Sequence, residues 1–262
     1  MKVVIFCGGM GIRMGGATER IPKPMIRVGT RPILWHIMKW YASWGHKEFI
    51  LCLGYQAEVV KEYFLSYNEA LGNDFVLAGR EVELLASDMD DWHITFLDTG
   101  IQATIGDRLL ATRRYIGTDE IFLCTYGDGL TDAPLDQMID RLVQSQKTGL
   151  FMSVRPRLSY HVVASDEDGT VRSIETMASA DVRINGGFLV LRQRIFDELR
   201  PGEDIMDEAA RLARQGDMIT YRYDGFWAPM DTMKDKQDLD AIVEIGNGNI
   251  PWLAHVREPV AE

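Results

Sequence analysis

The first eleven residues constrain the fold more than any other stretch of this chain. Residues 3–7 are all apolar, which is typical of a strand that is buried on both faces inside a parallel sheet. Gly8, Gly9 and Gly11 follow immediately. Glycines here let the backbone turn sharply and leave its N–H groups open to an anion. We therefore expect a layered α/β fold with an anion site beside its first strand.

Two cations belong to the same stretch. Arg13 lies within the glycine loop, and Lys23 stands between Pro22 and Pro24, which restrict the backbone on either side of it. Amide donors combined with two fixed cations suit a polyphosphate. A glycine-rich turn with incidental charges would explain a short GGxG alone, but it explains the full spacing less well.

The remaining pattern alternates between strand-like and helix-like segments, as in a Rossmann-like α/β fold with a mixed, mostly parallel central sheet flanked by helices. Strands are expected at 49–53, 93–98, 121–126, 150–154 and 185–191, and helices at 33–41, 58–67, 108–115, 204–215 and 234–245. Asp168 and Gly169 indicate a hairpin turn. We predict one domain over residues 1–262, with a loose tail from about residue 247.

Composition limits the partners. The net charge of -11 disfavours nucleic acid and anionic membrane surfaces. The three cysteines lie in apolar runs without metal-ligand spacing, as expected for buried thiols in a reducing compartment. We find neither a secretion signal nor an apolar run near the ~20 residues that a membrane helix requires, so we expect a cytoplasmic protein.

Two aspartates stand where buried strands end. Asp128 lies in a GDG turn after the strand at 121–126, and Asp231 follows a second strand-like run in APMDT. Two carboxylates from separate strands can hold Mg²⁺, which prefers hard oxygen ligands. Either residue alone could instead be a turn or helix-cap residue. Asp132 is a weaker candidate, since its position before Pro134 suits a cap equally well.

Several of these motifs resemble one family. The opening segment GGMGIRMGGATERIPKPM is similar to the signature loop of the sugar-phosphate nucleotidyltransferases. The later stretches GYQAEVVKEYF, LDTG, FLCTYGDGLTD, INGGFLVL and GFWAPMDT resemble its cytidylyltransferase branch. The resemblance covers nearly the whole chain, and motifs that occur in one order are more specific than any motif alone.

The resemblance implies a single nucleotidyltransferase (GT-A-like) domain. It also implies an Mg²⁺-dependent transfer of a nucleotide from CTP to a hexose 1-phosphate, foremost α-D-glucose 1-phosphate, with release of pyrophosphate. Arg13 would contact the triphosphate and Lys23 the acceptor's phosphate, while Asp128 and Asp231 would hold the metal. The nucleotide would be contacted by Gly8, Gly9, Met10, Gly11, Ile12, Arg13 and Arg108. Arg donors match the cytosine acceptors O2 and N3.

The sugar phosphate would be contacted on another side of the site. The resemblance assigns sugar hydroxyls to Asn185, beside Gly186, and two adjacent glycines in a strand agree with the close approach of a ligand. Thr125 and Tyr126 stand just before Asp128 and can add hydroxyl contacts, although Tyr126 is equally plausible as core.

Departures from the family pattern keep alternatives open. Ile12 replaces a threonine, and Glu175-Thr176-Met177 replaces Glu-Lys-Pro, whose lysine contacts the acceptor. Either Arg172 or Arg183 substitutes for that lysine, or the acceptor is another sugar or cyclitol phosphate. UTP or dTTP as the nucleotide and a non-catalytic regulatory homologue also remain.

Two further interpretations concern class and assembly. A dinucleotide-dependent oxidoreductase is disfavoured because the chain lacks GxGxxG with its acidic partner. A homo-oligomer is expected because relatives often associate, and the tryptophans Trp35, Trp40 and Trp44 either form a subunit surface or belong to the core.

Overall fold

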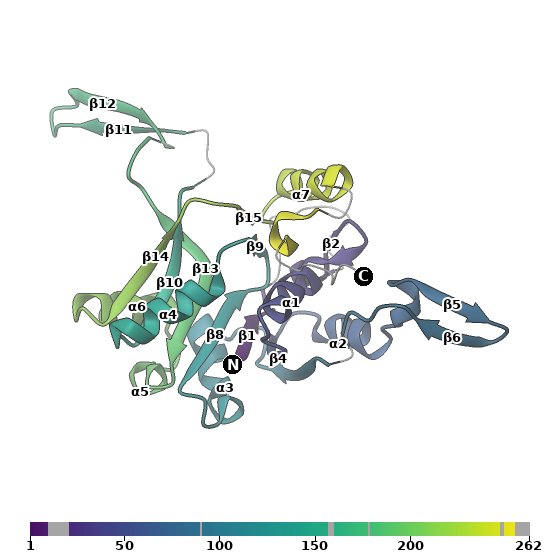
Figure 1. Ribbon diagram of the computed structural model, residues 1–262. Coiled ribbons are helices and arrows are strands. Elements are labelled where there is room, and N and C mark those ends of the chain that lie inside the picture. Colours follow the sequence, from purple (N-terminus) through teal and green to yellow (C-terminus); the bar gives the residue numbers. More distant parts are fainter. Residues whose placement is uncertain (10–20, 90, 157–159, 178, 247–248, 255–262) are drawn as a thin grey trace.

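A seven-stranded mixed sheet forms the centre of the computed structural model (Figure 1), which describes residues 1–9, 21–89, 91–156, 160–177, 179–246 and 249–254. Its order is β14-β10-β13-β8-β1-β4-β7. The bounds are β1 Lys2–Phe6, β4 Glu48–Leu53, β7 His93–Asp98, β8 Ile121–Tyr126, β10 Gly149–Val154, β13 Ile184–Arg192 and β14 Met218–Tyr223. Only β13 runs antiparallel to its neighbours in this sheet. The predicted mixed, mostly parallel α/β fold is confirmed.

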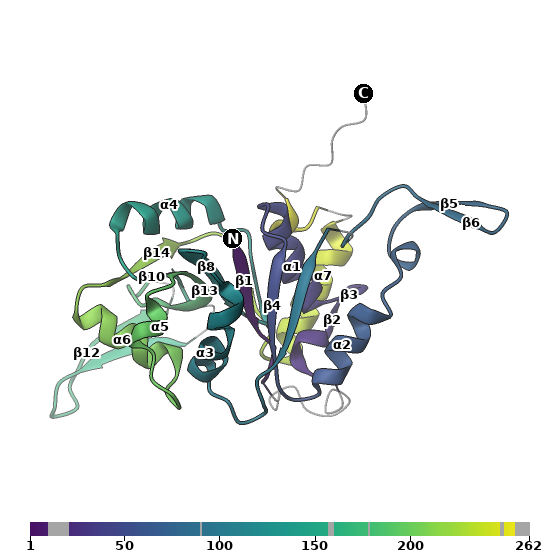
Figure 2. The same cartoon turned by 90° about the horizontal axis from the view of Figure 1, so that it is seen from below.

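Helices cover both faces of the sheet (Figure 2). They are α1 Ile33–Ser43, α2 Ala57–Leu65, α3 Ile105–Ile116, α4 Leu135–Ser145, α5 Ile195–Glu198, α6 Ile205–Arg214 and α7 Met233–Gly246. Successive residues of a strand point to opposite faces. Val3 and Ile5 of β1 therefore pack in the core with α1, α4 and α7, whereas Val4 and Phe6 pack with α3, α5 and α6. This double burial explains why residues 3–6 of the first strand are all apolar.

The chain order places a crevice beside β1. From β1 the chain continues to β4 and β7 on one side and then returns to β8 on the other. The first connections therefore diverge at the carboxyl ends of β1 and β8, which is where open α/β sheets bind ligands. Gly8 and Asp128 follow these two strand ends.

Short paired strands complete the architecture. They are β2 Arg27–Val28 with β3 Arg31–Pro32, β5 Phe75–Ala78 with β6 Glu81–Leu84, β9 Gly129–Thr131 with β15 Trp227–Pro229, and β11 His161–Ser165 with β12 Val171–Thr176. Single turns of 3₁₀ helix are η3 Lys23–Met25, η4 Glu69–Leu71 and η5 Pro251–Leu253. The hairpins β5/β6 and β11/β12 project from opposite flanks of the body (Figures 1 and 2). The hairpin predicted at Asp168 and Gly169 is present, and Gly169 has a φ of 88°.

One expectation needs correction, and one alternative that the sequence left open is decided. The segment after residue 248 is not loose as far as residue 254, because Trp252 is fully buried and donates a hydrogen bond from Nε1 to Nδ1 of His36 (3.2 Å). Trp35 and Trp40 are also buried, so they belong to the core rather than to a subunit surface. Among the described residues, no helix has the length and apolar character needed to cross a membrane.

Candidate active site

A two-stranded ladder brings the two predicted metal aspartates together. Asp128 precedes β9 and Asp231 follows β15, and these strands pair so that Gly129 lies opposite Pro229. The N–H of Met230 donates to the carbonyl of Asp128 (2.8 Å). Two residues more than 100 positions apart in the sequence are thus held by adjacent backbone segments.

Lys23 lies between these two carboxylates. Its Nζ is 2.6 Å from Oδ2 of Asp128 and 2.6 Å from Oδ1 of Asp231. Burial lowers the pKa of Lys23, but the charges and hydrogen bonds of both aspartates outweigh that effect and raise it. Lys23 is therefore a cation at the centre of the site.

Gly127 allows the Pro-Lys-Pro segment to approach the strand ends. A Cβ at this position would lie 3.0 Å from Cγ of Pro24 and 3.1 Å from the carbonyl oxygen of Phe6. The N–H of Gly127 also donates to that carbonyl (3.2 Å). The first glycine of the GDG turn thus sets how closely Lys23 is held to Asp128.

A cavity of about 270 Å³ opens beside the carboxylates. It is lined by Thr125, Tyr126, Asp128, Gly129, Ile184, Asn185, Gly186, Gly187, Phe188, Trp227, Pro229 and Asp231. The structure therefore brings together both predicted metal ligands and four of the residues expected to contact the sugar phosphate. No lysine or arginine is among these described lining residues, but Lys23 contacts two of them, Asp128 and Asp231.

The polar side chains that line this cavity already have hydrogen-bond partners within the protein. Oδ1 of Asn185 accepts from the N–H of Gly187 (2.9 Å), which fixes the amide beside the cavity. Tyr126 hydrogen bonds to the same side chain, and burial raises the pKa of Tyr126 to about 12. Thr125 is almost fully buried, and its hydroxyl donates to the carbonyl of Tyr126 (3.3 Å).

Arg108 joins the ends of three strands. Its Nη1 donates to the carbonyl of Leu53 (3.0 Å) and to Oγ1 of Thr99 (2.6 Å), and its Nη2 donates to the carbonyl of Gly8 (3.4 Å). A Cβ on Gly8 would lie 2.0 Å from Nη1, so any larger residue here would displace the guanidinium of Arg108. Arg108 is therefore next to the start of the predicted nucleotide loop, with most of its donors on backbone carbonyls.

The rest of that loop lies outside the described residues. Met10, Gly11, Ile12 and Arg13 belong to it, and so does the predicted contact of Arg13 with the triphosphate. Gly9 is described and exposed, at the edge of the site.

Asp132, the weaker metal candidate, and Arg172 and Arg183, the candidates to replace the missing lysine, all pair with other residues. Asp132 is no helix cap, because its Oδ1 accepts from the hydroxyl of Tyr223 and from the N–H of Phe226 (2.9 Å). Arg172 pairs with Asp166 in the exposed hairpin. Arg183 gives both Asp224 oxygens a hydrogen bond, at 2.7 and 2.9 Å. Neither arginine lines the cavity described above.

The donor set suits a divalent cation of the magnesium type. Asp128 and Asp231 offer hard carboxylate oxygens, their side chains are 33% and 45% exposed, and a cation already lies between them. Among the described residues, no cluster of three His, Cys, Asp or Glu side chains occurs. Two carboxylates would therefore leave the remaining coordination positions to water and phosphate oxygens.

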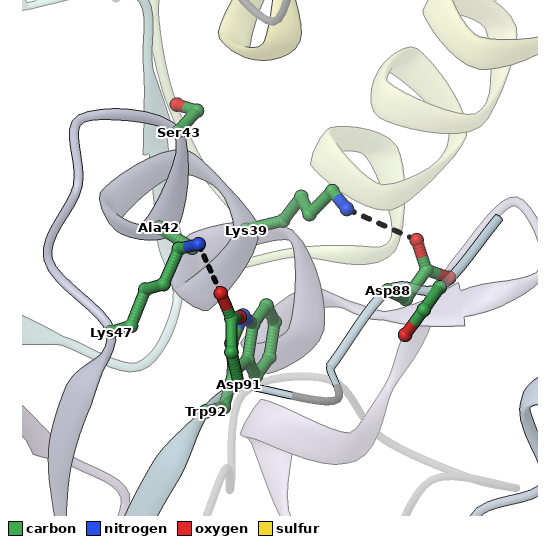
Figure 3. A pocket seen from close by; sticks show the side chains of 8 residues that line it. Lys39, Ala42, Ser43, Lys47, Asp88, Asp91 and Trp92 are labelled. Atoms are coloured by element: carbon green, nitrogen blue, oxygen red, sulfur yellow. Dashed lines mark hydrogen bonds and ion pairs between the residues drawn. The ribbon is translucent and has the colours of Figure 1, made fainter.

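A second cavity, of about 340 Å³, includes Lys39, Lys47, Asp88 and Asp91 in its lining (Figure 3). It is formed by α1 and the segments that precede β4 and β7, so it lies at the amino ends of these strands. The candidate active site lies instead at the carboxyl ends of β1 and β8. Its cations are neutralised, because Lys39 pairs with Asp88 (3.1 Å) and Lys47 with Asp91. It contains no predicted site residue.

Sequence reasoning gave too little weight to Trp227. This side chain is buried and forms a wall of the cavity, and its Nε1 donates to the carbonyl of Gly186 (2.8 Å). It thereby fixes β13 against β15. Its position two residues before Pro229 and four before Asp231 is the signal that could have indicated this role.

The fold has known counterparts. The chain superimposes on a UTP-bound UGPase from Acinetobacter baumannii with a TM-score of 0.70, at 18% identity, covering 95% of each chain. HddC from Yersinia pseudotuberculosis gives a TM-score of 0.66 at 19% identity, over 92% of this chain and 98% of that one. At these identities the likeness shows the fold alone.

The sequence matches the nucleotidyl transferase family over residues 2–200, and the chain therefore belongs to that family of enzymes. A probable glucose-1-phosphate cytidylyltransferase of Bacillus subtilis (strain 168) is 42% identical over 92% of this chain and 95% of that protein. The glucose-1-phosphate cytidylyltransferase of Salmonella typhi is 36% identical over 96% of this chain and 98% of that protein. The predicted resemblance to this branch is confirmed.

Proposed function

We propose that this enzyme joins CTP and a hexose 1-phosphate, foremost α-D-glucose 1-phosphate, to give a CDP-sugar and pyrophosphate. The names of the most similar relatives support this choice of substrates. The observation that carries the proposal is the meeting of Lys23, Asp128 and Asp231 beside one cavity that Asn185 also lines.

The reaction is a displacement at phosphorus. An oxygen of the acceptor's phosphate attacks the α-phosphorus of CTP, the bond from that phosphorus to the bridging oxygen breaks, and pyrophosphate leaves with the electron pair. Mg²⁺ held by Asp128 and Asp231 would polarise the α-phosphate and offset the developing negative charge. Lys23 offsets the charge of the acceptor's phosphate, and Asn185 orients the sugar through its hydroxyls. Positioning of this kind can supply several kcal/mol of the barrier reduction.

The nucleotide side rests on the glycine loop and Arg108. Backbone N–H groups from Gly8 onward and the guanidinium of Arg13 would bind the triphosphate. Nη2 of Arg108 holds the carbonyls of Gly8 and Ile101 through long hydrogen bonds of 3.4 Å, and it would turn to the acceptors of cytosine when the nucleotide binds. A uracil N3–H facing the same donor would leave both groups unpaired, at about 1–3 kcal/mol.

The acceptor's phosphate would depend chiefly on Lys23. The lysine that the family places after Glu175 is absent, and Arg172 and Arg183 are paired elsewhere. A chain with one cation fewer is expected to bind sugar phosphates weakly. Another phosphorylated sugar or cyclitol as the acceptor is the second candidate.

Pyrophosphate release tests the proposal. We expect activity with CTP and α-D-glucose 1-phosphate above that with UTP, dTTP or other sugar phosphates, and none once the metal is chelated. Asp128→Asn and Asp231→Asn should each reduce turnover by at least about 100-fold, because the charge compensation worth several kcal/mol is lost. Asp140→Asn on the exposed face of α4 removes the same charge elsewhere and should retain full activity. Full activity in Asp128→Asn would refute the metal assignment.

A homo-oligomer is also proposed, through the β5/β6 hairpin. Phe75 lies opposite Leu84 and Leu77 opposite Val82, so one face of this hairpin is entirely apolar, and all four side chains are exposed. An isolated two-stranded hairpin is only marginally stable in water. A second copy of the chain is the occupant that we favour, because a second hairpin, with the exposed apolar pair Val163 and Ile174, projects from the other flank of the same chain.

A further inference from the structure

The ammonium group of Lys23 occupies the position where two carboxylates converge. Both Oδ2 of Asp128 and Oδ1 of Asp231 lie 2.6 Å from its Nζ, and the lysine side chain is only 14% exposed. Without a cation between them, two carboxylates this close would repel each other and separate. Lys23 therefore keeps the pair together when no metal is present.

Lys23 already uses one oxygen of each carboxylate, Oδ2 of Asp128 and Oδ1 of Asp231. A divalent cation drawn to these two oxygens would face the like charge of Nζ and would have to displace it. The two cations therefore compete for one pair of carboxylates.

We propose that Lys23 is an exchangeable cation, which holds Asp128 and Asp231 in register before the metal binds and then transfers its charge to the acceptor's phosphate. This inference rests on the function proposed above. It adds that Lys23 opposes metal binding in the free enzyme, a role distinct from contact with substrate.

The local structure suits such an exchange. Lysine carries a compact charge on a flexible four-carbon stem. Its root is fixed, because Pro22 and Pro24 are both buried on either side of it. The ammonium group can therefore move while the backbone of Lys23 stays in place. The cavity that Asp128 and Asp231 line is the open space next to it.

The exchange predicts coupling between the metal and the acceptor's phosphate. An anion in the cavity draws Lys23 away from the carboxylates and so should tighten metal binding, and the metal should tighten anion binding by the same factor. Removing the ammonium group of Lys23 should therefore also tighten metal binding, even when no anion is present.

Mn²⁺ binding to the full chain tests this directly, by the electron paramagnetic resonance signal of free Mn²⁺ in the absence of nucleotide. We expect Lys23→Met to bind Mn²⁺ at least about 10-fold more tightly than the natural chain, even though it loses activity. Lys39→Met is the matched control, because Lys39 pairs with Asp88 in the second cavity, at the amino ends of β4 and β7, and its Mn²⁺ affinity should not change. Equal or weaker Mn²⁺ binding by Lys23→Met would overturn the exchange.

A second measurement keeps the test decisive if Lys23→Met does not fold. In the natural chain, sulfate as a stand-in for the phosphate group should tighten Mn²⁺ binding several-fold relative to chloride at equal ionic strength. The absence of that effect contradicts the exchange. If Asp128→Asn loses Mn²⁺ binding but Lys23→Met binds Mn²⁺ as the natural chain does, only this inference is overturned. If Asp128→Asn also binds Mn²⁺ as the natural chain does, the proposed metal site is overturned as well.

Discussion

His36 is held by two hydrogen bonds that require its neutral form. Its Nε2 donates to the carbonyl of Val28 (3.0 Å), and its Nδ1 accepts from Nε1 of Trp252 (3.2 Å). A proton on Nδ1 would face the donor of Trp252. Burial lowers the pKa of His36 from 6.5 to about 4, and the nearby charge of Arg31 acts in the same direction.

This environment predicts acid sensitivity. In the unfolded chain His36 takes up a proton near pH 6.5, whereas the folded chain resists it down to about pH 4. The free energy of unfolding should therefore fall as the pH decreases from 6.5 to 4, by about 2 kcal/mol at pH 5. Urea unfolding of the natural chain and of His36→Gln at pH 7.5 and pH 5 measures this.

The difference between the two chains isolates His36. The pKa of His46 is also lowered to about 4 by burial, and its contribution is common to both chains. If the natural chain and His36→Gln lose the same stability between the two pH values, the assignment to His36 is wrong.

The sequence predicted which residues belong to the site, but not how these residues contact one another. Motif and position predicted that Asp128 and Asp231 act together, and the structure places both beside one cavity. The contact of Lys23 with both was not foreseen, since it depends on the close approach at Gly127. A sequence shows which charges are present but not which of them share a neighbour.

At the scale of elements, the Pro-Lys-Pro turn and the GDG turn form one unit. The first lies in η3 and the second joins β8 to β9, and Gly127 is where the two touch. The strand and helix periodicities predicted each element separately. They could not predict this contact, because it depends on the missing side chain of one glycine.

Gly127→Ala should therefore impair catalysis without unfolding the protein. The added methyl group must displace Pro24, and with it the root of Lys23. We expect kcat/KM to fall by up to about 10-fold, since a displacement near 1 Å costs about 100-fold and the shift required here is smaller. Steady-state kinetics with varied sugar phosphate measures the change.

Gly246→Ala is the control for this substitution. Gly246 ends α7, and a Cβ there would meet nothing within 4 Å. Its kinetics should equal those of the natural chain. Unchanged kcat/KM in Gly127→Ala would mean that the spacing of the two turns does not position Lys23.

For the whole molecule, the β5/β6 hairpin has two unlike faces. Phe75, Leu77, Val82 and Leu84 share one face, whereas Val76 lies opposite Glu83 on the other. Cross-strand neighbours therefore divide this hairpin into an apolar side and an acidic side. The weak periodicity of residues 72–92 predicted only irregular or hairpin structure.

Val82→Lys should weaken the proposed self-association, because it places a charge within the apolar face. Val76→Lys makes the same substitution on the acidic face, opposite Glu83, and should leave the assembly intact. Sedimentation velocity over a range of protein concentrations distinguishes the two. A natural chain that stays monomeric throughout, or a Val82→Lys chain that assembles normally, contradicts the proposal.

The amino-acid sequence by itself determined the α/β class, the buried first strand, the glycine turn after it and the family. These depend on periodicity and on motifs, which are local properties of the chain. The tertiary structure decided which distant residues meet: the pairing of β9 with β15 sets Asp128 beside Asp231, and the missing Cβ of Gly127 admits Lys23 between them. It also decided that Trp252 belongs to the core, because burial depends on what the rest of the chain places around a residue.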